Sequence, residues 1–332
     1  MSDRITIIGA GAWGGALANL TQINGYEPTI WSRTCGERLA DTIDGKVAIV
    51  SAVSMSGVRS VIERLSGSIE PSQIIVTATK GLDAQTNSTP AQLWRIAFPA
   101  NPIVVLSGPN LSLEIQQGLP AATVVASQDR LAAARIQEIF SSPKFRVYTN
   151  DDPIGVEIAG TVKNVIAIAA GTCDGLKLGN NAKSALLTRG LAEIIRIGQY
   201  WGGKTETFYG LSGLGDLLTT CNSPLSRNYQ VGYGLAQGKT LDRVLADLQG
   251  TAEGVNTTKV LVEIAKTQDD TVGDGTTRYH TSSHFLLIVP LFSLFFAFIF
   301  QFIFLLFLLL FSLSPYIFTS YLFMHLTPTL SL

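Results

Sequence analysis

Lys163 is the residue whose position most needs a chemical explanation, because it interrupts the apolar stretch GVEIAGTVKNVIAIAAG at residues 155–171. The spacing predicts a helix, in which the ammonium group has Val162, Val165 and Ile166 as neighbours. A lysine near a helix end usually packs its stem on apolar surface and keeps its head in water. Partial burial in mid-helix would instead lower the pKa of the ammonium toward neutrality and suit it to proton transfer. The pattern alone leaves both interpretations open.

If the chain reduces a ketone, a lysine is the available proton donor, because all three histidines lie beyond residue 266. Reduction of a ketone by hydride needs a group that protonates the carbonyl oxygen. The three cysteines are scattered without a C-x-x-C pair, so neither a disulfide framework nor a metal site is predicted, and a reducing compartment fits. The net charge of −1 predicts no nucleic-acid partner. No secretory signal precedes the first strand pattern, which favours a cytoplasmic protein.

Two polar groups in the helical half could work with Lys163. Asp216 and Thr220 are four residues apart in SGLGDLLTTC, so a carboxylate and a hydroxyl would share one helical face. The segment SPLSRN supplies Ser226, Arg227 and Asn228, and an arginine among polar donors suits a phosphate. Taken singly, Asp216 and Thr220 could equally be helix-cap residues and Arg227 a surface ion-pair partner.

Further candidates follow predicted strands in the first half. Lys80 stands in ATKG, and Gly108 and Asn110 stand in SGPN. Doubly wound sheets bind ligands at the carboxyl ends of their strands, where these residues are predicted to lie. The alternative for Lys80 is an ordinary loop lysine.

Gly9, Gly11 and Gly14 form a G-x-G-x-x-G turn directly after an apolar strand and before a helix. In this context the glycines permit a tight turn, close approach of a pyrophosphate, and close helix packing. The second strand ends at Trp31-Ser32-Arg33, where an NAD site usually has an acidic residue. Arg33 would suit a 2′-phosphate, which favours NADPH and leaves NADH open. The alternatives are a glycine turn without a ligand and a solvated loop arginine.

The chain falls into four predicted segments. Strands alternate with helices in residues 1–150, which predicts an α/β Rossmann domain with a doubly wound parallel sheet. Residues 151–266 are predicted to form an all-helical substrate domain, followed by a polar linker at 267–284. The tail at 285–332 contains an uncharged run, 285–311, longer than the ~20 residues that cross a bilayer.

Taken together, these motifs resemble the NAD(P)-dependent glycerol-3-phosphate dehydrogenases of the bacterial and plastid type. The likeness covers residues 4–266 in order and is carried by IGAGAWGGALA, ATKGL, LSGPN, GTVKNVIAIAAG, NAKSALLTRGLAE, GLSGLGDLLTTC, SRNYQVG and AEGVNTTK. It implies reversible reduction of dihydroxyacetone phosphate to sn-glycerol 3-phosphate with NADPH or NADH, for phospholipid synthesis, and suggests a homodimer.

The resemblance also implies roles for individual residues. Lys163 would be the proton donor and acceptor, in a catalytic group with Asp216 and Thr220. The residues implied to contact the substrate are Lys80, Gly108, Asn110, Lys163, Asp216, Ser226, Arg227 and Asn228. Those implied to contact the cofactor are Gly9, Gly11, Ala12, Trp13, Gly14, Arg33, Lys80, Ser112, Arg227 and Glu253.

Three departures from the family pattern stand out. Asn110 occupies a position that is usually serine or threonine, and the segment after Arg33 is shorter than usual. The further soluble helices expected after VLVEIAK are replaced by the apolar tail. A frameshift or misjudged gene boundary is the leading explanation, ahead of a membrane anchor with membrane contact through 285–311 and of a buried core helix. The rival functions are a related lysine-dependent oxo-acid reductase and a catalytically impaired, membrane-tethered remnant that binds dinucleotide.

Overall fold

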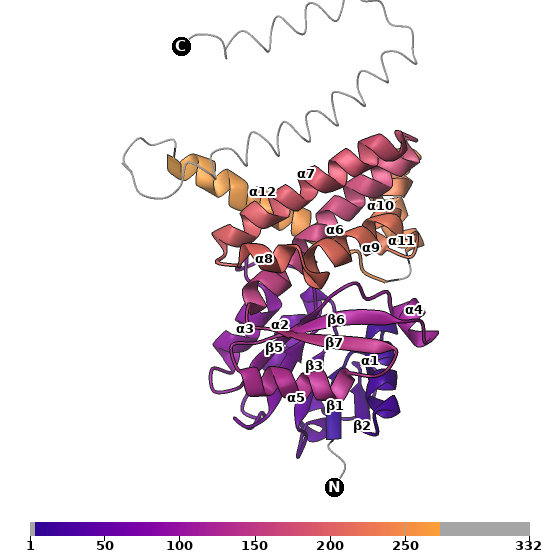
Figure 1. The fold of residues 1–332 in the computed structure, drawn as a ribbon. Coiled ribbons are helices and arrows are strands. Elements are labelled where there is room, and N and C mark those ends of the chain that lie inside the picture. The colour runs from indigo at the N-terminus through magenta and orange to yellow at the C-terminus, as the bar shows by residue number, and fades with distance from the viewer. Residues whose placement is uncertain (1–3, 249, 273–332) are drawn as a thin grey trace, which may run out of the picture. The chain divides into compact units, whose positions relative to one another are not determined.

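The computed structural model describes residues 4–248 and 250–272 (Figure 1). The chain divides into two compact units, residues 1–262 and 263–332, and every predicted site residue lies in the first. The predicted boundary near residue 150 falls inside this first unit and stays a prediction. The apolar tail and residues 273–284 of the predicted linker lie outside the described residues.

A seven-stranded sheet forms the first half, in the order β2-β1-β3-β4-β5-β6-β7. The strands are β1 (Arg4–Ile8), β2 (Glu27–Trp31), β3 (Ala48–Ser51), β4 (Ile74–Thr77), β5 (Ile103–Ser107), β6 (Ala121–Ala126) and β7 (Phe145–Asn150). Each neighbouring pair is parallel except β5 and β6, which run antiparallel. The predicted parallel sheet is therefore confirmed for most of its strands, while β6 and β7 run in the opposite direction to the other strands. The connection contains only the five-residue helix α4 (Ser112–Gln116), and α4 packs against α1 (Ala12–Ile23) instead of returning along the sheet.

Helices cover both faces of the sheet, which confirms the doubly wound architecture. On one face, α1 and α5 (Arg130–Phe140) bury Leu17 and Ile136 against Ile7 and Val50. On the other face, α2 (Met55–Leu65), α3 (Pro90–Ala97) and a 3-10 turn, η1 (Leu39–Thr42), pack on the alternate strand residues. The strands are buried on both sides because their apolar residues form nearly continuous runs.

The second half is helical, as predicted. Its elements are α6 (Pro153–Gly175), α7 (Gly179–Tyr200), α8 (Thr205–Phe208), a π-helical turn η2 (Leu211–Gly215), α9 (Asp216–Asn222), α10 (Arg227–Ala236), α11 (Leu241–Asp247) and α12 (Glu253–Val272). LSGLGDLLTTC therefore begins as a π turn and becomes regular helix at Asp216. Helix α12 continues to Val272, so the first residues of the predicted linker are helical.

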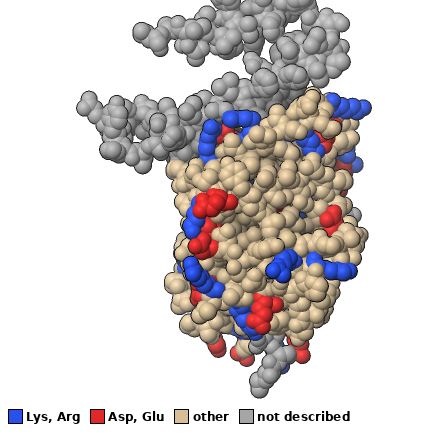
Figure 2. All heavy atoms as spheres, in the orientation of Figure 1, with Lys and Arg blue, Asp and Glu red and all other residues tan. Residues whose placement is uncertain are grey.

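Helix α6 is the central helix of this part and packs against α7, α9 and α10. It begins where the Asp152 carboxylate accepts a hydrogen bond from the Gly155 N–H at 2.9 Å, which caps its N-terminus. It is long and apolar enough to cross a membrane. However, 83% of its most apolar 18-residue stretch is buried inside the fold, as in the core helix of a folded domain. On the face shown in Figure 2, acidic and basic side chains are interspersed.

Candidate active site

One face of α6 lies against the sheet half of the molecule. Glu157 Oε1 accepts a hydrogen bond from the Ala91 N–H at the start of α3, at 2.8 Å. Thr161 Oγ1 accepts one from the Gly81 N–H, in the loop after β4, at 3.1 Å. Residues 157 and 161 are four apart and share a helical face. This contact brings the segment that carries Lys163 next to the segment that carries Lys80.

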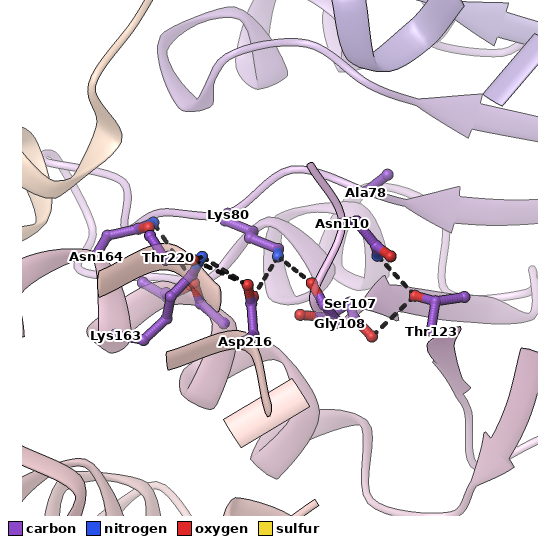
Figure 3. Close-up of polar contacts among 12 residues, drawn as sticks. Ala78, Lys80, Ser107, Gly108, Asn110, Thr123, Lys163, Asn164, Asp216 and Thr220 are labelled. Carbon is purple, nitrogen blue, oxygen red and sulfur yellow. Dashed lines mark hydrogen bonds and ion pairs between the residues drawn. The ribbon is translucent and has the colours of Figure 1, made fainter. Parts of the chain in front are cut away.

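Two lysines and one aspartate meet at the end of this contact (Figure 3). Lys163 Nζ donates to Asp216 Oδ1 at 2.8 Å and also to Thr220 Oγ1. Lys80 Nζ donates to Asp216 Oδ2 at 2.6 Å and to the Gly108 carbonyl oxygen at 3.1 Å. The structure thus brings together five predicted site residues from both halves of the chain. Lys163 is only 5% exposed, so it does not extend its head into water.

The charges in this cluster shift each other's proton affinity. Burial lowers the pKa of Lys163 to about 8, with the like charge of Lys80 adding to the effect and the Asp216 carboxylate opposing it. For Asp216, burial alone would raise the pKa, but the ammonium groups of Lys163 and Lys80 outweigh it and hold the pKa below its usual range. The cluster carries two cations and one anion, so it presents a net positive charge in a buried position.

Asn228, on α10, links α6 to the start of α12 through hydrogen bonds. Its amide Nδ2 donates to Asn164 Oδ1 at 2.9 Å, and its Oδ1 accepts from the Gly254 N–H at 2.9 Å. Ser226, predicted to contact substrate, caps α10 by accepting from the Tyr229 N–H at 3.2 Å. Asn164 was not predicted as a site residue, and its only sequence signal was that it adjoins Lys163.

The neighbouring residue Arg227 is the first residue of α10 and is exposed. Its guanidinium lies against Gly250, just before α12. It takes no part in the hydrogen bonds of the Lys80–Lys163 network, and its charge opposes the effect of burial on the pKa of the Glu253 carboxyl group.

Asn110 lies near the other side of the cluster, after β5. Its Nδ2 donates to Thr123 Oγ1 at 2.8 Å, and Thr123 in turn donates to the Ser107 carbonyl oxygen at 3.1 Å. The Asn110 Oδ1 atom is buried without a partner. An amide anchored through nitrogen presents its oxygen as an acceptor, so this position offers a ligand a different group from a serine hydroxyl.

The glycine turn has the shape that a pyrophosphate requires. Gly9 has φ of +120°, and a Cβ there would lie 2.7 Å from the Ala52 carbonyl oxygen. A Cβ at Gly14 would overlap the carbonyl oxygen of Gly9, whereas the space beside Gly11 is open. No side chain caps the N-terminus of α1, so its N–H groups are free to meet phosphate oxygens.

The other predicted cofactor residues surround this turn or lie further along the same edge. Ala12 begins α1 and accepts a hydrogen bond from Gln116 of α4, while Trp13 Nε1 donates to the Ala78 carbonyl oxygen at 3.3 Å. Arg33 is exposed two residues beyond β2, and Ser112 is the first residue of α4. Arg33 and Ser112 take no part in the Lys80–Lys163 network.

Glu253, the last predicted cofactor residue, bridges α12 and the sheet half. Its Oε1 accepts from the Met55 N–H at the start of α2, at 3.1 Å. Burial raises the pKa of its carboxyl group. Within the described residues, no group of three His, Cys, Asp or Glu side chains is placed to hold a metal ion.

Glu157 makes the stability of the fold depend on pH. Burial raises its pKa from 4.5 to about 7, because the hydrogen bonds it accepts only partly compensate for lost hydration. An acid with a raised folded-state pKa loses stability as pH rises from its unfolded pKa to its folded pKa. Glu157→Gln is therefore expected to raise the free energy of unfolding at pH 8 by about 2–3 kcal/mol relative to the unsubstituted protein, and to change it little near pH 4.

Urea unfolding at the two pH values measures this difference. Glu206→Gln, at an exposed carboxylate on α8, is the matched control and should change stability by less than about 0.5 kcal/mol. If Glu157→Gln changed the free energy of unfolding equally at both pH values, the result would show that ionisation of Glu157 does not destabilise the fold.

A dinucleotide turn at a doubly wound sheet, joined to a helical part with a buried lysine at the junction, defines a dinucleotide-dependent oxidoreductase. Similarity to known protein families and structures supports this class and narrows it to one family. The chain matches the family models described as NAD-dependent glycerol-3-phosphate dehydrogenase N-terminus, at residues 4–46 and 34–133, and C-terminus, at 152–272. The chain belongs to this glycerol-3-phosphate dehydrogenase family, as the motifs suggested.

Individual relatives support the assignment. The glycerol-3-phosphate dehydrogenase (NAD(P)+) of Nostoc sp. is 62% identical over 266 residues, which cover 80% of this chain and 87% of the relative. The enzyme of the same name from Gloeobacter violaceus is 55% identical over 264 residues, covering 79% and 87%. The crystal structure of glycerol-3-phosphate dehydrogenase from Coxiella burnetii superimposes with a TM-score of 0.76 at 34% identity, covering 81% of this chain and 90% of that chain.

Proposed function

We propose that this chain reduces dihydroxyacetone phosphate to sn-glycerol 3-phosphate, reversibly and with NADPH or NADH, using Lys163 as the proton donor. The observation that carries the proposal is the buried contact of Lys163 with Asp216 and Thr220, beside Lys80, in a chain of this family. The product would enter glycerophospholipid synthesis. A related oxo-acid reductase and a catalytically impaired remnant are less well supported, because the likeness to glycerol-3-phosphate dehydrogenases spans both halves of the site.

In the proposed mechanism, a nicotinamide dinucleotide held along the Gly9–Gly14 turn would supply the hydride that reduces the C2 carbonyl carbon. The Lys163 ammonium donates a proton to the carbonyl oxygen, so that the ketone becomes a secondary alcohol and the lysine becomes a neutral amine. Asp216 accepts a hydrogen bond from Lys163 and orients its ammonium, while the Lys80 ammonium stabilises negative charge that develops on the oxygen. In the oxidative direction, the neutral Lys163 amine removes the hydroxyl proton.

The substrate phosphate is proposed to bind on the α10 side of the cluster. Arg227 offers a guanidinium there, and Asn228 and Ser226 lie beside it on the first turn of the helix. Gly108 and Asn110 are proposed to border the substrate from the sheet side, next to Lys80. The dinucleotide is proposed to lie along the glycine turn, with Arg33 favouring the 2′-phosphate of NADPH.

The direct test is nicotinamide oxidation by the full-length, detergent-solubilised protein on addition of a substrate panel. Dihydroxyacetone phosphate should be turned over, whereas unphosphorylated dihydroxyacetone should react at least ~100-fold more slowly because it lacks the phosphate that Arg227, Asn228 and Ser226 are proposed to bind. Turnover of a small 2-oxo acid instead would favour the related reductase. Binding of NADPH without turnover of any substrate would favour the remnant.

The rate of reduction is expected to depend on pH through Lys163. The group must be protonated to act as an acid, and its pKa is lowered by burial to about 8. The value of kcat/KM for dihydroxyacetone phosphate should therefore be constant below pH 7 and fall as pH rises through about 8, whereas kcat/KM for glycerol 3-phosphate oxidation should rise over the same range. Initial rates in both directions test this, and two profiles that fall together would contradict it.

The proposed setting is the cytoplasm, with a homodimer as the proposed assembly. Sedimentation of the purified protein tests the assembly. Cell fractionation tests the location, and recovery in the membrane fraction would support membrane contact through residues 285–311.

A further inference from the structure

Two small residues, Gly160 and Ser107, lie against each other where α6 meets the end of β5. Gly160 lies on α6, three residues before Lys163, and Ser107 is the last residue of β5. A Cβ at Gly160 would overlap the Ser107 hydroxyl oxygen and would lie 3.4 Å from Cε of Lys80. The helix therefore approaches the strand as closely as the absence of a side chain allows.

The Ser107 hydroxyl has no hydrogen-bond partner among the described residues, although the residue is only 2% exposed. Leaving a buried hydroxyl without a hydrogen-bond partner destabilises a fold, so such groups are uncommon in folded proteins. Packing, and not a hydrogen bond, sets the direction of this side chain. It fills the space that a larger residue on α6 would need.

The contact also joins the two halves of the site. Lys80 and Gly108 come from the sheet half, whereas Lys163 and Asp216 come from the helical half. Lys163 lies three positions after Gly160 on the same rigid helix, so a shift of the helix at Gly160 moves the proposed proton donor with it. A displacement of about 1 Å in a catalytic geometry can lower the rate ~100-fold.

We infer that Gly160 and Ser107 are a positioning pair, which sets the distance between the proton donor on α6 and the sheet half that carries Lys80. Neither residue touches the reacting atoms. The inference rests on the proposed role of Lys163, because it concerns the placement of that group.

The test is a size-complementation cycle in the full-length protein. Gly160→Ala should lower kcat/KM for dihydroxyacetone phosphate ~100-fold. Ser107→Ala removes the atom that the new methyl group would meet, so the double variant should recover to within about tenfold of the unsubstituted protein. Ser107→Ala alone should stay within about twofold, because the lost hydroxyl had no partner.

The pH profile provides a second readout that a loss of stability would not produce. In Gly160→Ala, Lys163 moves away from the like charge of Lys80 and out of a closely packed site, so the kinetic pKa of reduction should rise, and it should return in the double variant. Gly171→Ala is the matched control, because a Cβ there would overlap the Tyr229 carbonyl oxygen inside the helical half. Ser107→Ala should not rescue that variant.

Two results would overturn the inference. A fully active Gly160→Ala protein would show that the Ser107 side chain adopts another rotamer and that α6 does not move. A double variant as impaired as Gly160→Ala would show that Ser107 is not the residue that limits the approach. Lys163→Met in the same assay distinguishes these outcomes from a failure of the proposed function. An active Lys163→Met protein would show that Lys163 is not the proton donor, and the proposed function itself would then be wrong.

Discussion

Lys163→Met is expected to lower kcat for dihydroxyacetone phosphate reduction by ~10²–10⁴-fold, the usual contribution of a general acid. Methionine is unbranched and apolar, so it can occupy the buried position of the lysine without a hydration cost. The Asp216 carboxylate retains Lys80 as a partner at 2.6 Å, which limits the damage to folding. Stopped-flow measurement of NADPH oxidation, beside NADPH binding by fluorescence, should show lost chemistry with retained binding.

Two further variants define what is lost. Lys163→Arg keeps the positive charge but cannot release a proton near neutral pH, so it should be nearly as impaired as methionine if proton transfer is the role. Lys204→Met removes a lysine from an exposed ion pair with Asp151, at 2.7 Å, and should leave kcat unchanged. An active Lys163→Arg enzyme would assign the lysine an electrostatic role only.

Asp216→Asn is the second large expected effect, because one carboxylate accepts hydrogen bonds from the buried Lys163 ammonium and the partly buried Lys80 ammonium. Without it, Lys163 and Lys80 repel each other, and the pKa of Lys163 should fall below about 8, since the carboxylate is the main group that raises it. The kinetic pKa of reduction should move down, and kcat/KM at pH 8 should fall ~100-fold or more. Removing one partner of a buried ion pair also costs about 3–5 kcal/mol of stability, which urea unfolding measures.

The matched control is Asp174→Asn, at a carboxylate on α6, the helix that carries Lys163. Asp174 accepts hydrogen bonds from Lys183 at 2.6 Å and from the Tyr229 hydroxyl at 2.7 Å, outside the Lys80–Lys163 network. It should lower stability without moving the kinetic pKa. If Asp216→Asn raises the kinetic pKa or leaves it unchanged, the carboxylate does not control the proton affinity of Lys163.

Much of the fold could be predicted because its signals are local. The G-x-G-x-x-G turn lies between a strand and a helix that are recognisable within about twenty residues, and the structure has β1 and α1 there. The four-residue spacing of Asp216 and Thr220 placed both on one helical face, and in α9 the Thr220 hydroxyl donates to Asp216 Oδ1 at 3.1 Å. The site roles of these residues stay predictions until the variants are measured.

Other features had no local signal. The antiparallel direction of β6 depends on where α4 packs after the chain leaves β5. The five residues of α4 are compatible with either direction of the strand that follows. Likewise, nothing near Glu157 in the sequence indicates that it meets Ala91, 66 positions away. Ser107 was part of the predicted strand motif, but its contact with Gly160 exists only because α6 crosses the end of β5.

The sequence by itself determined the class of fold, the dinucleotide turn and the identity of the unusual lysine, because periodicity, glycine spacing and an ammonium among apolar residues are short-range properties. Only the tertiary structure decided between a lysine whose head lies in water and a lysine buried beside a carboxylate. That choice depends on a carboxylate 53 positions further along the chain and a second lysine 136 positions from that carboxylate. Chain folding alone brings these charges within hydrogen-bond distance, and their mutual field sets the proton affinity on which the proposed reaction depends.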